Sequence, residues 1–215
     1  MSCRVGEGLR GKVRAMLAER PATIDKSDRL WEAAVLVPLV KNKSGVGILF
    51  EERSKQLTWQ PGDVCFPGGK RDKVDKNLAQ TAIRETCEEL GVSPDNVNIY
   101  GELDYLVTHL GPILHPYVGS IHDLNEINPN KDEVERVFVV PLKVLLEQEP
   151  RKIRMQLANK APKDFPYDLL PEYPKARNRR KGYDVYFYSY KGHVIWGMTA
   201  RVLHGFLERF KKAQK

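Results

Sequence analysis

The order of elements along the sequence predicts an α+β fold. Short apolar runs typical of β-strands outnumber the helical segments, and several follow one another with no helix between them. The 215-residue chain is long enough for one domain with a full hydrophobic core, and 41% apolar with 29% charged residues is an ordinary globular composition. We therefore expect a single α+β domain without a regular alternation of strand and helix.

Two features suggest where this domain begins and where it is interrupted. Residues 8–19 have the pattern of a short helix that ends before Pro21. Segment 150–182 is rich in proline and contains a basic cluster, which predicts an irregular insertion. We assign residues 1–30 to an N-terminal helical extension and residues 31–215 to one domain that carries the insertion.

The first half of the domain begins with a predicted hairpin. Apolar runs at 33–40 and 46–50 flank a Lys-Asn-Lys-Ser-Gly turn and predict two paired strands. Residues 60–77, rich in Pro, Gly, Asp and Lys, predict a long loop, and a helix over 78–90 follows, ended by Gly91 in the left-handed cap position. Further strands are predicted at 97–107, 113–121, 134–140, 185–190 and 193–196, and a last amphipathic helix at 200–212.

The helix over residues 78–90 carries an acidic stripe. With roughly 100° of turn per residue, Glu85, Glu88 and Glu89 share one face, and Ile83, Cys87 and Leu90 lie opposite as a core-facing stripe. Clustered carboxylates repel one another, which raises the pKa of at least one of them unless a cation relieves the repulsion. Hard oxygen ligands on one rigid face suit Mg²⁺ or Mn²⁺, although a solvated acidic face has the same pattern.

The segment around this helix favours the metal site. Phe66-Pro67-Gly68-Gly69 puts two glycines where the backbone must turn tightly or approach a ligand closely. The chain then runs to Arg84-Glu85-Thr86-Cys87-Glu88-Glu89-Leu90-Gly91-Val92. This segment resembles the Nudix box: Gly, five residues, Glu, seven residues, then Arg-Glu-aliphatic-x-Glu-Glu-x-Gly-aliphatic. It departs from that pattern in a spacing one residue longer, in Asp75 at the middle Glu, and in Thr86 at an aliphatic position.

The resemblance implies the Nudix fold, a mixed β-sheet sandwiched between helices, and metal-dependent hydrolysis of a pyrophosphate bond. On this basis we expect Glu85 and Glu89 to bind Mg²⁺ or Mn²⁺. Glu88 is expected to be a further ligand or to help activate the nucleophile, and Arg84 to hold the carboxylates in register. The main-chain N–H groups of Gly68 and Gly69 are expected to reach the phosphates.

A narrower resemblance lies upstream. Arg53-Ser54, Gly62 and Phe66-Pro67-Gly68-Gly69 are similar to the signature of the coenzyme A pyrophosphatase branch, which also has an arginine where this chain has Thr58. The resemblance implies hydrolysis of coenzyme A or its derivatives to 3′,5′-ADP and 4′-phosphopantetheine or acyl-phosphopantetheine. It makes Arg53 the first candidate for direct phosphate contact, with Ser54 beside it.

Two alternatives stay open. Losing an arginine weakens the binding of a highly charged ligand. Thr58 therefore keeps open a Nudix pyrophosphatase that acts on ADP-ribose, a dinucleoside polyphosphate or an oxidised nucleoside triphosphate. The second alternative is a non-catalytic nucleotide- or RNA-binding module on the same fold. The intact set of glutamates counts against it, because a binding module has no need for three carboxylates that repel one another.

Charge and composition constrain the partners. The net charge of +7 attracts anionic ligands, but a solvated surface explains the basic patches as well, so we expect a small nucleotide substrate and no nucleic-acid partner. Three widely spaced cysteines argue against a disulfide framework or a zinc site. With no secretory, transmembrane or peroxisomal signal in the sequence, we expect a cytoplasmic protein that does not bind membranes, either a monomer or a homodimer.

Other chemistry-bearing residues are weaker candidates. Glu133 is a candidate extra ligand or base, and the basic cluster of residues 177–181 a candidate contact for a 3′-phosphate, although a surface role is the simpler interpretation of both. Cys87 points to the core. The histidines lack metal-ligand spacing, and Trp196 and the nearby tyrosines fit strand packing better than base stacking: His109, His115, His193, Tyr183, Tyr186, Tyr188 and Tyr190.

Overall fold

The computed structural model describes residues 2–18, 30–43, 45–108, 111–157, 162–169 and 182–214. The chain divides into two compact units, Met1–Leu30 and Trp31–Lys215. The first contains helix α1 (Ser2–Leu17), which starts and ends earlier than the helix expected over 8–19, and its described side chains are exposed. None of the helices in the described ranges is long and apolar enough to cross a membrane.

A mixed sheet forms the centre of the second unit. Its strands in the described residues are β1 (Trp31–Asn42), β2 (Gly45–Arg53), β3 (Val64–Cys65), β4 (Gly68–Lys70), β5 (Val97–Glu102), β6 (Leu106–Val107), β7 (Pro112–Ile121) and β8 (Val134–Pro141). Strand β1 pairs antiparallel with β2 and β4 and parallel with β7. Strands β3 and β8 extend the sheet beyond β2, and β5 and β6 pair with β7. The hairpin predicted between the first two strands is confirmed.

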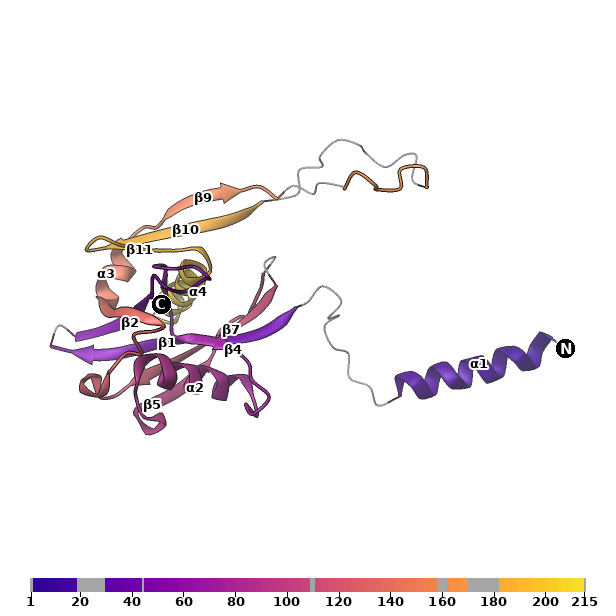
Figure 1. Ribbon diagram of the computed structural model, residues 1–215, viewed down its shortest axis with the longest axis horizontal. Coiled ribbons are helices and arrows are strands. Elements are labelled where there is room, and N and C mark those ends of the chain that lie inside the picture. Colours follow the sequence, from indigo (N-terminus) through magenta and orange to yellow (C-terminus); the bar gives the residue numbers. More distant parts are fainter. Residues whose placement is uncertain are drawn as a thin grey trace. The chain divides into compact units, whose positions relative to one another are not determined.

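Helices cover both faces of this sheet. Helix α2 (Leu78–Leu90) packs on one face, and α3 (Leu142–Glu147) and α4 (Gly197–Ala213) lie on the other (Figure 1). A smaller antiparallel sheet of β9 (Arg151–Met155), β10 (Tyr183–Tyr190) and β11 (His193–Trp196) packs on α4, and two short 3₁₀ turns, η1 (Pro94–Asn96) and η2 (Leu124–Glu126), complete the described elements. The expected α+β fold, a mixed sheet between helices, is confirmed.

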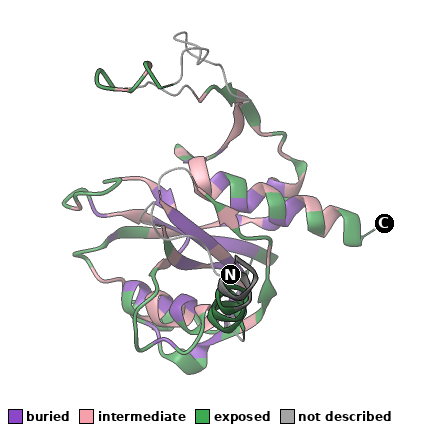
Figure 2. Ribbon diagram, turned by 90° about the vertical axis from the view of Figure 1, so that its right-hand side faces the viewer, coloured by how far each residue is buried: buried purple, intermediate pink, exposed green. Residues whose placement is uncertain are grey.

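The core lies on the two faces of the central strands, as the distribution of buried residues in Figure 2 shows. Because side chains alternate along a strand, Leu49 of β2 joins Leu36 and Ala82 on the α2 face, whereas Ile48 and Phe50 join α4 on the other. This alternation leaves Glu51 on the same face as Leu49. A carboxylate thus follows the core residues of β2 on the side that faces α2.

Two segments that were expected to be irregular contain strands. The loop expected over 60–77 contains β3 and β4, which are short and pair with β2 and β1, so local composition could not reveal them. The strand expected over 97–107 is divided into β5 and β6, and the short helix α3 was not predicted. The insertion expected over 150–182 begins with a regular strand, β9, which pairs with β10. Residues 158–161 and 170–181 of that insertion, with the basic cluster 177–181, lie outside the described residues.

Candidate active site

Helix α2 positions the three predicted glutamates. It starts at Asn77, whose side chain accepts a hydrogen bond from the Gln80 N–H, and it ends at Gly91, which has a φ of 65°. The glutamates differ in exposure: Glu89 is 3% exposed, whereas the side chains of Glu85 and Glu88 are 16% and 55% exposed. The acidic face is therefore not a uniform solvated stripe, because the β4 segment covers part of it.

Arg84 joins the carboxylates of this face. Its guanidinium lies 2.9 Å from Glu85 Oε1 and 2.9 Å from Glu88 Oε2. On its other side it donates two hydrogen bonds to Asp75, each of 2.9 Å. These bonds hold the pKa of Asp75 well below its usual range and raise the pKa of Arg84. Arg84 thus fixes Glu85 and Glu88 relative to the loop before the helix.

The two glycines of β4 make room for the carboxylates. The Gly68 N–H donates to Glu89 Oε2 at 2.7 Å, so that group is committed to a glutamate, contrary to the expectation that it would reach a phosphate. A Cβ on Gly69 would lie 2.5 Å from the Glu85 carboxyl carbon, and one on Gly68, with φ of 147°, would lie 2.3 Å from Ala34 O. Gly68 therefore requires glycine, whereas a side chain at residue 69 would displace the Glu85 carboxylate.

Glu51 is a site residue that sequence reasoning missed. It is fully buried, and its Oε1 accepts a hydrogen bond of 3.1 Å from Cys65 Sγ. Its Oε2 has no hydrogen-bond partner among the described residues. The alternation of β2 could have indicated it, because Glu51 shares the phase of core residue Leu49.

Burial and mutual repulsion perturb these groups. Burial, more than any neighbouring charge, raises the pKa of Glu51 to about 7. Burial also raises the pKa of Glu89 well above its ordinary value, with a further contribution from the charge of Glu51. The pKa of Glu85 is raised as well, first by burial and then by the charges of Glu88 and Glu133. Three carboxyls on this face of the molecule thus lack sufficient compensating positive charge.

This arrangement fits a divalent cation. The unpartnered Oε2 of Glu51 and the raised pKa values of Glu51, Glu85 and Glu89 show a deficit of positive charge that a cation would correct. Carboxylate oxygens are also the ligands that Mg²⁺ and Mn²⁺ prefer. Within the described ranges, however, no three His, Cys, Asp or Glu side chains already surround one point. In the described structure Arg84 contacts Glu85 through Oε1 and Glu88 through Oε2.

A cleft of about 450 Å³ opens beside the carboxylates. Three of its lining residues each touch one glutamate: Gly68 bonds to Glu89, Gly69 packs on Glu85, and Cys65 bonds to Glu51. The acidic cluster therefore lies directly behind this part of the cleft wall. Its other walls come from Trp31, Ala33, Val35, Arg53, Trp59, Gln60, Phe66, Pro112, Leu114, Met198, Thr199 and Val202.

The structure separates the two upstream candidates. Arg53 lines the cleft, donates from Nε to the Trp59 carbonyl at 3.3 Å, and lowers the pKa values of Glu51 and Glu89 by its charge. Ser54 is buried outside the cleft lining, and its N–H donates to the Glu133 carbonyl at 2.8 Å. Arg53 is thus placed to contact a ligand, whereas Ser54 holds the chain in position.

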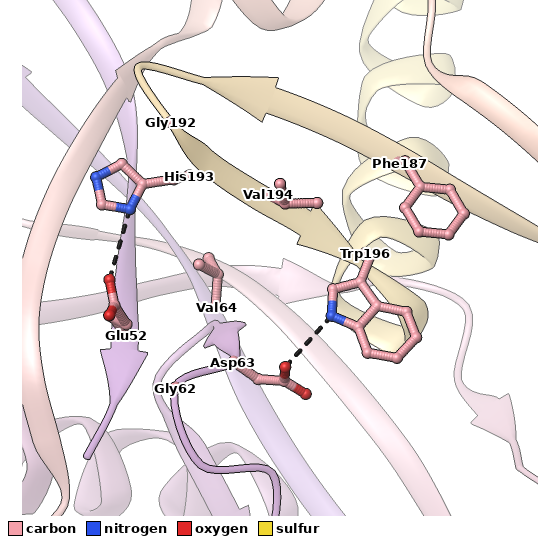
Figure 3. Close-up of a pocket in the computed structure, with 9 residues that line it drawn as sticks. All are labelled: Glu52, Gly62, Asp63, Val64, Phe187, Gly192, His193, Val194 and Trp196. Carbon is pink, nitrogen blue, oxygen red and sulfur yellow. Dashed lines mark hydrogen bonds and ion pairs between the residues drawn. The ribbon is translucent and has the colours of Figure 1, made fainter. Parts of the chain in front are cut away.

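A second hollow, of about 490 Å³, lies between the β2–β3 segment and strands β10 and β11 (Figure 3). Its lining includes Glu52, which faces away from Glu51 because neighbouring strand residues alternate. There His193 Nδ1 lies 3.6 Å from Glu52, and Trp196 Nε1 donates to Asp63 at 3.4 Å. Neither the hollow nor the cleft is lined by Glu51, Glu85, Glu88 or Glu89, but three residues of the cleft wall contact these glutamates, so we take the cleft as the candidate site.

The weaker candidates have structural surroundings. His115 pairs with Glu102 at 2.7 Å, and Cys87 packs against the α2-side core. The tyrosines of β10 are at least partly buried, and Tyr188 donates to or accepts from His204 at 3.0 Å. His109 lies outside the described residues.

Comparison with known proteins agrees with this geometry. Residues 30–159 match the NUDIX domain family. An uncharacterised Nudix hydrolase of Pectobacterium atrosepticum is 32% identical over 174 residues, which cover 80% of this chain and 79% of that protein. The mitochondrial coenzyme A diphosphatase of Homo sapiens is 31% identical over 88% of this chain and 74% of its own length. The peroxisomal coenzyme A diphosphatase of Mus musculus is 40% identical over 54% of this chain and 49% of its own length. The chain therefore belongs to the Nudix hydrolase family, in the branch that contains the coenzyme A diphosphatases.

Proposed function

We propose that this protein hydrolyses the pyrophosphate bond of coenzyme A or its derivatives, giving 3′,5′-ADP and 4′-phosphopantetheine or its acyl form. One observation carries the proposal: residues of the cleft wall contact a buried acidic cluster, in which Glu51 has an unpartnered oxygen. The similarity to coenzyme A diphosphatases along most of the chain supports the choice of substrate. The catalytic unit that we propose is residues 31–215, with residues 1–30 as an extension.

Nudix hydrolases use divalent metal ions, and we propose Mg²⁺ or Mn²⁺ here. When bound, such an ion neutralises phosphate oxygens and lowers the pKa of water, which are the two requirements of anhydride hydrolysis. Glu85, Glu89 and Glu51 would hold it, and Glu88, the most exposed of the α2 glutamates, is a further ligand or accepts the proton of the attacking water. Arg84 positions Glu85 and Glu88.

Other residues of the cleft bind and orient the substrate. Arg53 offers a guanidinium to the diphosphate at the entrance to the acidic cluster. The glycines of β4 allow the backbone to lie close to the carboxylates. The N–H group of Gly68 bonds to Glu89, so we do not assign it to the substrate. We propose the cytoplasm as the compartment; fractionation of cells that express the protein tests this assignment.

A second candidate function rests on Thr58. This residue is exposed in the loop after β2 and carries no charge where the branch signature has an arginine. A diphosphate substrate that is less charged than coenzyme A, such as ADP-ribose, is compatible with that loss.

Chromatographic product analysis tests the proposal. The purified protein is incubated with Mg²⁺ or Mn²⁺ and, separately, coenzyme A, ADP-ribose, NADH and diadenosine polyphosphates. We expect metal-dependent 3′,5′-ADP from coenzyme A. Turnover of ADP-ribose alone would support the second candidate, and tight nucleotide binding without any turnover would support a binding module instead.

A further inference from the structure

Trp59 is an exposed aromatic side chain in the wall of the cleft. It lies in the loop between β2 and β3 with 58% of its surface exposed. Within the described part of the chain, its indole stacks on no other ring. An exposed aromatic ring that lines a ligand-sized cleft is a candidate for contact with the ligand.

The loop that carries Trp59 is fixed by backbone bonds. The Arg53 N–H donates to Asp63 O at 2.9 Å, and the Gly62 N–H donates to Arg53 O at 3.1 Å. The Arg53 side chain also donates to the Trp59 carbonyl at 3.3 Å. Since the same arginine lines the cleft, the indole is held next to the group that we expect to meet the diphosphate.

A second indole lines the same cleft from another element. Trp31, the first residue of β1, is 38% exposed, and the Lys70 ammonium lies 5.8 Å from its ring centroid. The cleft therefore combines two aromatic side chains with Arg53. Its volume of about 450 Å³ is within the range of small-molecule sites.

We propose that Trp59 stacks on the purine base of the substrate, with Trp31 as the second aromatic contact. This proposal rests on the proposed function and specifies how the site binds the nucleotide half. Every base offers a π face to an indole, so the contact gives affinity without a hydrogen-bond code. Thr58 cannot form an ion pair with a phosphate, so this loop binds the nucleotide through the neighbouring ring.

The test compares a ligand that has a base with one that lacks it. Calorimetry measures the affinities of 3′,5′-ADP and of inorganic pyrophosphate, each with Mg²⁺, for the full-length protein and its variants. We expect Trp59→Ala to weaken 3′,5′-ADP binding by roughly 5- to 100-fold and to leave pyrophosphate binding unchanged. Trp59→Phe should restore most of the affinity.

Two further variants complete the test. Tyr100→Ala removes an equally exposed ring from β5, outside the lining of the cleft, and should change neither affinity. Thr58→Arg should tighten the binding of both ligands at low salt and make it salt-dependent. An equal loss of both affinities in Trp59→Ala would assign the residue to loop structure and overturn the stacking proposal, as would no loss at all. Binding that follows the expected pattern in a protein that does not hydrolyse coenzyme A would overturn only the proposed function.

Discussion

Two buried carboxylates, Asp75 in the loop before α2 and Glu51 at the end of β2, are 6% and 0% exposed. Asp75 accepts hydrogen bonds from Arg84, from the Thr81 hydroxyl and from the Asp72 N–H, and its pKa is lowered. Glu51 accepts one bond from a thiol, keeps an oxygen without a partner in the described structure, and has a pKa raised to about 7.

The difference separates scaffold from site. A buried carboxylate with a full set of donors stabilises the fold as an anion, whereas one without them destabilises the fold until a cation arrives. Asp75 holds Arg84, which holds Glu85 and Glu88, so the carboxylate with a full set of donors positions part of the acidic cluster. The four predictions that follow test this contrast, from the largest expected effect to the smallest.

Glu89→Gln should reduce kcat for coenzyme A by on the order of 10³-fold, because it removes a proposed metal ligand and about 4 kcal/mol of charge stabilisation. Steady-state kinetics with Mg²⁺ measure the loss. Glu135→Gln, an exposed residue of β8, is the control and should be unaffected. Activity within tenfold of the wild type would contradict the proposed role of Glu89 as a metal ligand.

Glu51→Gln should stabilise the metal-free protein at high pH. Burial raises the pKa of Glu51 from 4.5 to about 7, so the folded state binds a proton more tightly than the unfolded chain. The resulting stability is fully present below pH 4.5 and is lost as the pH rises through about 7, with a loss of up to about 3 kcal/mol. Urea unfolding in EDTA from pH 4 to 8 measures it. If the free energy of unfolding of the wild type does not change over that range, Glu51 is not the uncompensated buried carboxylate that we infer.

Asp75→Asn should change the free energy of unfolding in the opposite direction. It should destabilise the protein by about 2 kcal/mol, since it leaves part of the Arg84 guanidinium without its partner. The measurement is urea unfolding at pH 7. Lowering the pH should also remove this contribution in the wild type, because a depressed carboxyl pKa gives stability that is present above the ordinary Asp value and lost in acid. Asp72→Asn, whose backbone N–H would still reach Asp75, serves as the matched control.

Asn77→Ala should cost about 1 kcal/mol, the usual effect of losing a helix N-cap. The same unfolding measurement applies, and Asn77→Ser should recover most of the loss. Because the cap lies at the far end of α2 from Glu89, kcat should hardly change. A large loss of kcat would show that the scaffold region is less rigid than the hydrogen bonds around Asp75 imply.

The elements that the sequence predicted well are those with local signals. Helix α2 was predicted at both ends, because its turn pattern and Gly91 lie within the segment itself. The hairpin of β1 and β2 likewise follows from two apolar runs and the turn between them. Strands β3, β4 and β9 were missed because each is short or polar and is defined by a partner elsewhere in the chain.

The site residues likewise divide into those that local sequence signals predict and those that they do not. The spacing of Glu85, Glu88 and Glu89 follows from helix geometry, and the structure places Arg84 between two of them, while their catalytic roles stay predictions. Glu51 could not be found from charge alone, because Glu52 and Arg53 beside it look like an ordinary charged strand end. Its burial depends on the core that the sheet shares with α2, which segments distant in the sequence build together.

The parallel pairing of β1 with β7 has a consequence for how the protein is made. The ribosome releases β1 early, but β1 cannot pair with β7 until residues 112–121 emerge. At ordinary elongation rates this takes several seconds. During this interval the apolar segment Ala33–Val40 has one edge that is not yet paired. Chaperone dependence during translation should therefore be concentrated in nascent chains that end between β2 and β7.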